Sequence, residues 1–155
     1  MKNNLPILIY RSSRFFFTHK MRHISKFIDW TNRFLFACWC PGSAKIGNKC
    51  SLGYWGVATI IHKDAIIGNN CLIAQGVTIG RNFGDKQVPI IGNDVYIGAG
   101  SVVFGEITIG NNVIIGANSV VNKSIPDNCT VAGNPFRIIK TDRKETYYEL
   151  DNKVL

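Results

Sequence analysis

An aliphatic residue recurs at every sixth position through the middle of the chain. The series is Ile61, Ile67, Ile73, Ile79, Ile91, Ile97, Val103, Ile109, Ile115 and Val121. Small residues follow most of these positions directly. A period of six fits neither the 3.6-residue repeat of an amphipathic helix nor the two-residue alternation of an ordinary strand. It predicts short strands joined at corners, each with one aliphatic side chain inside and a residue without bulk at the turn.

Three such sides make one coil of eighteen residues, so residues eighteen apart are expected to stack. The predicted interior column is Ile61, Ile79, Ile97 and Ile115. The predicted corner column beside it is His62, Gly80, Gly98 and Gly116. The series breaks only within 81–89, which predicts a protruding loop. The sequence therefore predicts an all-β parallel β-helix over residues 41–140, with about four to five coils.

Residues 1–40 are predicted to form a short helical arm. One face of the expected helix is apolar and contains Ile24, Phe27, Ile28, Thr31 and Leu35. The opposite face is polar and contains Lys26, Asp29, Asn32 and Arg33. Two interpretations stay open at this stage. The arm is either a cap over the first coil, because solenoid ends need covers, or an amphipathic helix on a membrane surface.

Charge and aromatic residues are concentrated in this arm. The chain has a formal charge of +8, and residues 1–40 carry seven basic residues and a single acid, Asp29. They also hold nine of the seventeen aromatic residues. Such an arm suits an anionic membrane or an acidic partner. Because no nucleic-acid-binding motif accompanies it, a nucleic acid is not the expected partner. The charged tail, residues 141–155, is expected to be exposed.

The cysteines and the apolar runs limit the location and the type of site. Five cysteines without a CxxC pair favour reduced, buried thiols over a disulfide framework or a metal site. The longest apolar run, 34–40, is too short to span a bilayer, and the N-terminus lacks a convincing signal peptide. We therefore expect a cytoplasmic protein, with peripheral contact at the inner face of the membrane as the alternative.

Several segments resemble the serine acetyltransferase family and its relatives that O-acetylate bacterial surface polysaccharides. They are the stretches 41–47, 75–80, 97–100, 115–121 and 132–139, together with Pro126. The resemblance covers residues 41–140. It implies a left-handed β-helix, a homotrimer, and acetyl-CoA as a co-substrate with no permanently bound cofactor or metal. The function that it implies is transfer of an acetyl group to a hydroxyl.

In this family pantetheine runs along the backbone at the positions of Ala99 and Ala117. These alanines lie eighteen residues apart, beside Gly98 and Gly116, so they are expected to stack and to allow close approach of a ligand. Three basic side chains are candidates for the CoA phosphates, namely Lys123, Arg137 and Lys140.

His62 is the candidate general base, because it is the only histidine between residues 41 and 140. An imidazole in a corner column of glycines gains nothing from the core, so it is expected to point outwards. Asp64 or Asp85 is the candidate for orienting the ring. The alternative is that His62 is an ordinary solvated corner residue.

The chain departs from serine acetyltransferases in two places. Their Asp-His-Gly/Ala-Thr-Gly segment corresponds here to 52–59, which lacks a histidine, and their Gly-Asp-Arg-His-Pro loop corresponds to 84–89, which also lacks one. Tyr54 and Trp55 in the first segment suit a sugar ring and are the candidate acceptor-binding residues. We therefore expect the acceptor to be a sugar of a surface polysaccharide. The alternatives are L-serine, for cysteine biosynthesis, and a β-helix with no catalytic role.

Overall fold

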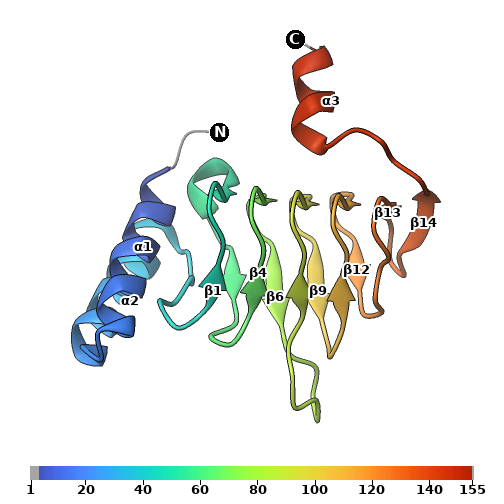
Figure 1. Cartoon of the computed structure of the whole chain (residues 1–155). Helices are drawn as coiled ribbons and strands as arrows, with labels where there is room; N and C mark the ends of the chain where they lie inside the picture. The colour runs from blue at the N-terminus through green and yellow to red at the C-terminus, as the bar shows by residue number, and fades with distance from the viewer. Residues whose placement is uncertain (1–3, 155) are drawn as a thin grey trace.

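Short parallel strands wind into a β-helix that carries two helices at its first coil and a third beside its middle coils (Figure 1). The computed structural model describes residues 4–154. The helices are α1 (Leu5–Thr18), α2 (Arg22–Phe36), the short 3-10 helix η1 (Gly53–Gly56) and α3 (Tyr147–Val154). The predicted β-helix and its helical arm are thus confirmed.

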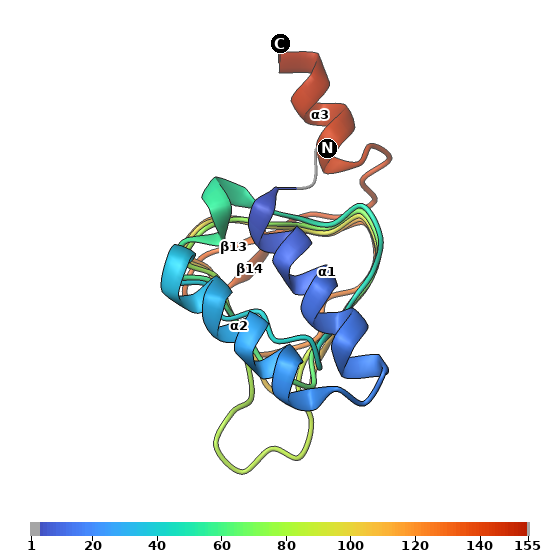
Figure 2. The same cartoon turned by 90° about the vertical axis from the view of Figure 1, so that its left-hand side faces the viewer.

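The strands form the three faces of a prism, and Figure 2 shows this prism end-on. Sheet A contains β3 (Ile60–Ile61), β6 (Thr78–Gly80), β9 (Val102–Phe104) and β12 (Val120–Val121). Sheet B contains β1 (Lys45–Ile46), β4 (Ile66–Ile67), β7 (Ile90–Ile91) and β10 (Thr108–Ile109). Sheet C contains β2 (Ser51–Leu52), β5 (Leu72–Ile73), β8 (Tyr96–Ile97), β11 (Ile114–Ile115), β13 (Thr130–Ala132) and the antiparallel β14 (Arg137–Lys140).

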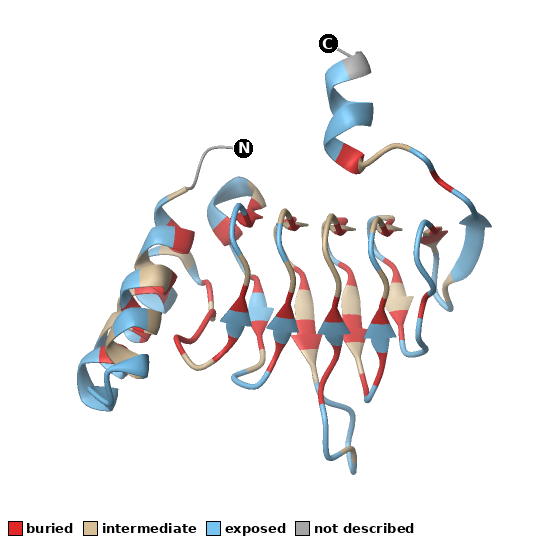
Figure 3. Cartoon of the chain, in the orientation of Figure 1, coloured by how far each residue is buried: buried red, intermediate tan, exposed pale blue. Residues whose placement is uncertain are grey.

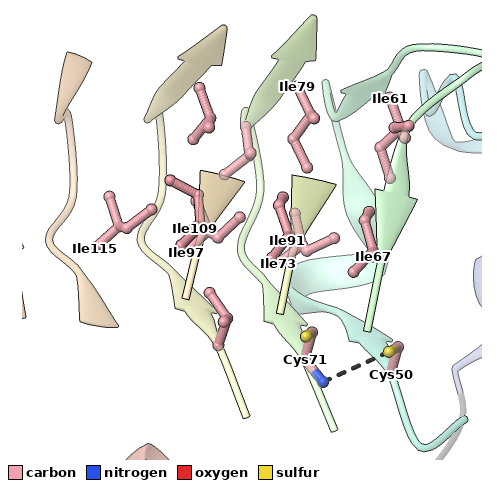
Figure 4. Close-up of a cluster of buried hydrophobic side chains, with 14 of the residues drawn as sticks. Cys50, Ile61, Ile67, Cys71, Ile73, Ile79, Ile91, Ile97, Ile109 and Ile115 are labelled. Atoms are coloured by element: carbon pink, nitrogen blue, oxygen red, sulfur yellow. Dashed lines mark hydrogen bonds between the residues drawn. The ribbon is translucent and has the colours of Figure 1, made fainter. Parts of the chain in front are cut away.

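The predicted interior column is wrong beyond its second member. Ile61 pairs with Ile79 as expected, but Ile79 then pairs with Val103, whereas Ile97 lies between Ile73 and Ile115 in sheet C. The reason is the loop 81–89. Strand β7 follows β4 twenty-four residues later instead of eighteen, because the loop adds one extra six-residue side to its coil. Figure 4 shows the resulting columns of isoleucines inside the prism.

The arm caps the open first coil with polar as well as apolar side chains. The Tyr10 hydroxyl accepts a hydrogen bond from the Ile46 N–H (3.0 Å) and donates one to the Ala44 carbonyl (2.9 Å). The Arg11 guanidinium donates to the carbonyls of Ile46 and Gly47. These backbone groups belong to the first strand of the prism, which has no neighbouring strand on that side. The arm therefore provides hydrogen-bond partners for backbone groups at the edge of the first coil, which the β-helix alone would leave unpaired.

The structure shows which face of α2 is turned to the protein, a question that the sequence left open. Its polar residues Ser25, Asp29 and Asn32 are buried against α1 and the chain that follows α2, while Phe27 and Phe34 are 75% and 89% exposed. Buried polar groups are tolerated there because they bond one another. The Ser13 hydroxyl of α1 donates to the Asp29 carboxylate (2.5 Å), which also accepts the Gly42 N–H (3.0 Å). Figure 3 shows that the outer surface of the arm is largely exposed. The exposed residues of α2 are mainly apolar and basic, among them Phe27, Phe34 and Lys26.

The C-terminal segment returns to the β-helix instead of remaining exposed along its whole length. Arg143 is buried, and its guanidinium donates to the carbonyls of Asn112 and Glu145. The Tyr147 hydroxyl donates to the Asn70 carbonyl over 3.0 Å. These bonds hold α3 beside the edge between sheets B and C. No helix in residues 4–154 is long and apolar enough to cross a membrane.

Candidate functional site

The candidate site residues lie on two different edges of the prism. Edge AB is where the chain passes from sheet A to sheet B, and edge CA is where it passes from sheet C to sheet A. His62, Asp64 and the loop 81–89 lie on edge AB, whereas Tyr54, Trp55 and the corners at 98–99 and 116–117 lie on edge CA. His62 and Gly98 therefore do not share a column, which corrects the prediction. The extra six residues of the loop cause this shift too.

His62 points out of the prism from edge AB, as expected, and its side chain retains 26% exposure. Nδ1 of the ring accepts a hydrogen bond from the Asp64 backbone N–H over 3.2 Å. The Asp64 carboxylate lies 3.7 Å from the same nitrogen, too far for a hydrogen bond in this arrangement. Asp64 thus places both a hydrogen-bond donor, its backbone N–H, and an acceptor, its carboxylate, within 4 Å of Nδ1.

A small cavity of about 220 Å³ opens beside His62. Its walls come from the corner that follows β3 and from the loop 81–89, which contributes Arg81, Lys86, Gln87 and Val88. Asp85 does not line this cavity. Its carboxylate lies near Gly105, on the next coil along edge AB. The structure therefore brings Asp64 to His62 and leaves Asp85 apart from it.

The corners of edge CA stack as the sequence predicts. The Asn118 N–H donates to the Ala99 carbonyl over 2.8 Å, which ties the Ala99 corner to the next coil. A Cβ at Gly98 would lie 2.5 Å from the Ala117 nitrogen, and one at Gly116 would lie 2.9 Å from the Ala132 Cβ. Glycine at 98 and 116 is therefore already required by coil stacking. In the described residues, the backbone N–H groups of Ala99 and Ala117 have no hydrogen-bond partner.

Tyr54 and Trp55 lie in η1, at the first corner of edge CA. Both have left-handed backbone angles, with φ of 46° and 61°, which side chains of this size seldom adopt. Trp55 stacks on Phe36 at the end of α2, with ring centroids 5.7 Å apart. Tyr54 is 79% exposed. Within one chain the two aromatic residues are separated from His62 by the width of sheet A.

The three basic candidates for the CoA phosphates are all exposed and do not form one cluster by their positions in the fold. Lys123 follows β12 and lies on edge AB of the last coil, whereas Arg137 and Lys140 lie at the two ends of β14. Among residues 4–154, no three His, Cys, Asp or Glu side chains are grouped in a way that could hold a metal ion.

A second cavity, which sequence analysis did not identify, lies between α2 and edge AB. It has a volume of about 550 Å³, and its lining includes Arg22, Lys26, Trp30, Trp39 and Lys63. We call it the arm groove. Asp64 borders both this groove and the cavity beside His62. The concentration of aromatic and basic residues in the arm was the only sequence signal for it, because the pattern does not show which side chains meet the β-helix.

The chain matches two hexapeptide-repeat families. The bacterial transferase hexapeptide (six repeats) family matches residues 89–123, and the hexapeptide repeat of succinyl-transferase matches residues 58–83. The two matched segments flank the loop 81–89, and each covers part of the β-helix.

Individual relatives cover more of the chain. Serine acetyltransferase of Bacillus pumilus is 32% identical over 96% of this chain and 69% of its own length. The enzyme of the same name from Synechococcus elongatus is 35% identical over 86% of this chain and 55% of its own length. A putative colanic acid biosynthesis acetyltransferase of Escherichia coli is 42% identical over 62% of this chain and 59% of its own length. The chain thus spans between about half and two thirds of these relatives.

Solved structures show the same architecture. Serine acetyltransferase of Brucella abortus in complex with coenzyme A has a TM-score of 0.83 and 29% identity over 89% of this chain and 56% of that one. Two β-helices superpose this well only if they coil with the same hand. The handedness of this chain is therefore that of the serine acetyltransferases.

Proposed function

Because the chain belongs to the serine acetyltransferase family, we propose that it is an acetyl-CoA-dependent O-acetyltransferase that acetylates a sugar hydroxyl in surface-polysaccharide synthesis. The observation that carries the enzymatic part is the stacked pair of corners at Ala99 and Ala117. Both residues are small, and both have a backbone N–H without a partner in the described chain. An extended ligand with amide oxygens, such as pantetheine, matches donors spaced one coil apart.

In the proposed reaction the acceptor hydroxyl attacks the thioester carbonyl carbon. The new C–O bond forms, the C–S bond breaks, and CoA leaves as the thiol. His62 takes the hydroxyl proton and passes it to the departing sulfur, so that the ring is restored after each turnover. Asp64 holds the ring, and the cavity beside His62 receives the hydroxyl.

This chemistry requires more than one copy of the chain. His62 lies on edge AB and the acetyl-CoA corner on edge CA, so a single chain cannot bring them together. They meet where edge AB of one copy faces edge CA of a neighbour. Repetition of this contact around a threefold axis closes a ring, and we propose a homotrimer. Light scattering is expected to give a mass three times the 17.2 kDa chain, and a monomer at micromolar concentration would contradict it.

Two observations favour a sugar over serine as the acceptor, whereas the relatives include enzymes of both kinds, at 42% identity for the colanic acid acetyltransferase and 49% for a serine acetyltransferase of Arabidopsis thaliana. The two segments that carry histidine in serine acetyltransferases lack it here. The arm also exposes apolar side chains among basic ones on α2. We propose that this surface rests on an anionic membrane, where lipid-linked glycans are assembled.

Serine O-acetyltransferase is the second candidate, favoured by the relatives of that name. The decisive experiment supplies acetyl-CoA to the purified protein with either L-serine or a panel of sugars and glycosides, and separates the products by mass. We expect O-acetylated sugar and negligible O-acetylserine. Robust turnover of serine at millimolar concentration would overturn the sugar proposal. Failure to bind acetyl-CoA would instead identify a β-helix with no catalytic role.

A further inference from the structure

The arm groove has the dimensions and walls of a ligand site. Its volume of about 550 Å³ lies within the range of small-molecule pockets, roughly 300–1,000 Å³. Two tryptophans stand in its wall with ring centroids 6.0 Å apart and planes at 71°, Trp30 from α2 and Trp39 from the start of the first coil. The two rings touch edge to face, and the Arg33 guanidinium lies 5.8 Å from the centre of the Trp39 ring. Trp30 is 61% exposed, so its ring is the aromatic surface that remains accessible to a sugar.

Three basic side chains line the groove together with the two tryptophans. Arg22 and Lys26 line the groove from α2, and Lys63 lines it from edge AB. Lys63 has a partner, because its ammonium lies 3.5 Å from the Asp64 carboxylate. In the described residues, Arg22 and Lys26 have no carboxylate within ion-pairing distance. Asp29, the other acid of the groove, directs its Oδ1 to the Ser13 hydroxyl and the Gly42 N–H. The groove therefore has cationic side chains available for an anion.

The position of the groove connects it to the reacting centre. Asp64 borders the groove and also the cavity of His62. Figure 2 shows the first turns of α2 and the loop 81–89 at the same corner of the prism. A ligand whose anionic part lies between Arg22 and Lys26 would thus extend along edge AB toward His62.

We propose that the arm groove binds the diphosphate of a diphosphate-linked sugar and thereby directs the sugar hydroxyl to His62. This inference rests on the proposed function and specifies its acceptor. Guanidinium and ammonium groups suit phosphate oxygens, and the exposed Trp30 ring suits the sugar next to the diphosphate. Such a diphosphate comes either from a nucleotide-linked or from a lipid-linked sugar. The exposed apolar face of the same helix favours the lipid-linked source.

The test is a binding measurement by calorimetry with three probes: inorganic pyrophosphate, UDP-glucose and farnesyl diphosphate. The variant Arg22→Gln/Lys26→Gln removes the two groove cations without a carboxylate partner, of which Arg22 lies over the Phe17 ring at 5.9 Å. The control Lys20→Gln/Lys49→Gln removes the same charge from exposed positions outside the groove. We expect the groove variant to weaken binding of every probe by about 10-fold or more, as loss of charged hydrogen bonds does, and the control to leave it near the original value.

The aromatic wall is tested separately with Trp30→Ala, which should weaken binding of UDP-glucose and spare pyrophosphate. Tighter binding of farnesyl diphosphate identifies the lipid-linked source, and tighter binding of UDP-glucose identifies the nucleotide. No binding of any probe, or binding that Arg22→Gln/Lys26→Gln leaves unchanged, overturns the inference even if sugars are acetylated. Acetylation of serine alone would instead overturn the proposed function.

Discussion

Asp64 donates its backbone N–H to Nδ1 of His62 over 3.2 Å, while its carboxylate stands 3.7 Å from the same atom. With Nδ1 accepting, the neutral ring carries its proton on Nε2 and cannot use that nitrogen as a base. If the carboxylate takes over, Nδ1 keeps the proton and Nε2 becomes free to accept one. We therefore propose that Asp64 is a positioning residue that selects between the His62 tautomer able to act as a base and the one that is not.

Replacing His62 with alanine is expected to lower kcat by ~10²–10⁴-fold, the usual contribution of a general base. Asp64→Asn should lower kcat less and leave the acetyl-CoA KM unchanged, because the backbone N–H remains and only the carboxylate is lost. Asp64→Glu should recover part of the loss. Steady-state kinetics measure these effects, with circular dichroism to confirm the fold. Near-normal turnover of His62→Ala would show that another base acts.

Tyr10→Phe is predicted to destabilise the first coil. The substitution leaves the Ala44 carbonyl and the Ile46 N–H, both buried, without the hydroxyl that satisfies them. Each unsatisfied group costs about 1–3 kcal/mol. Urea unfolding measures the loss, and hydrogen exchange should accelerate at the Ile46 amide in particular. Tyr148→Phe is the control, because this exposed tyrosine lies in α3. An equal effect in both variants would contradict the capping role.

Asp29 makes the stability of the arm dependent on pH. Burial raises the pKa of its carboxyl above the ordinary value, and the hydrogen bonds from Ser13 and Gly42 offset only part of that. The folded protein thus holds this proton more tightly than the unfolded chain, so stability declines as pH rises from about 3.9 through the folded pKa. Asp29→Asn keeps an acceptor oxygen and carries no charge.

We therefore expect Asp29→Asn to gain stability relative to the natural protein as pH increases from 4 to 7. Urea titrations at both pH values measure this difference. Asp151→Asn, at an exposed position in α3, is the matched control and should show little change with pH. A constant difference between the Asp29 variant and the natural protein would mean that the pKa of Asp29 is the same in the folded and unfolded states.

The period of six was sufficient to predict the prism, because a repeated inward aliphatic residue has few structural explanations. It could not predict which face of the prism each strand after the loop 81–89 joins. The pattern resumes in phase after 81–89, so the extra side is invisible in the series, and Ile97 and Gly98 were assigned to the wrong face. Counting strands on each side of the loop would not have settled this, since a loop of nine residues is compatible with either register.

The orientation of α2 could not be predicted for a different reason. Helical periodicity separates Phe27 from Asp29 but does not say which of them faces the protein. In water the apolar face is normally inside. Here the open backbone edge of the first coil and the neighbouring α1 favour polar partners, so that Ser25 and Asp29 are inside. The arm groove depends on this inversion, which explains why the sequence did not predict it.

The exposed face of α2 predicts selective binding to anionic membranes. Vesicles containing phosphatidylglycerol should sediment with the protein, whereas pure phosphatidylcholine vesicles should not, because each basic residue near an anionic surface contributes about 1 kcal/mol. Phe27→Ser/Phe34→Ser should reduce the partition coefficient by about 10-fold or more, since burying a phenylalanine side chain is worth about 1.5–3 kcal/mol. A higher salt concentration should also weaken binding of the protein to anionic vesicles.

Phe83→Ser is the matched control for membrane binding. Phe83 is fully exposed within the loop 81–89. This loop projects from the middle of the prism, away from α2 (Figure 1). Its loss should not change the partition. If it does, or if the α2 variant binds as well as the natural protein, the membrane surface lies elsewhere.

Tyr54 allows backbone strain and acceptor binding to be separated. Its φ of 46° and ψ of 47° place a bulky residue in the left-handed region, and its exposed side chain has no hydrogen bond or aromatic-ring contact within residues 4–154 that would offset the strain. Tyr54→Gly should therefore stabilise the fold by about 1 kcal/mol. Lys49→Gly is the matched control, because Lys49 is also exposed and left-handed, with φ of 55°. Both variants should gain similar stability in urea unfolding.

If Tyr54 stacks on the acceptor sugar, only its variant should show a raised acceptor KM, whereas unchanged kinetics in both would remove Tyr54 from the acceptor site.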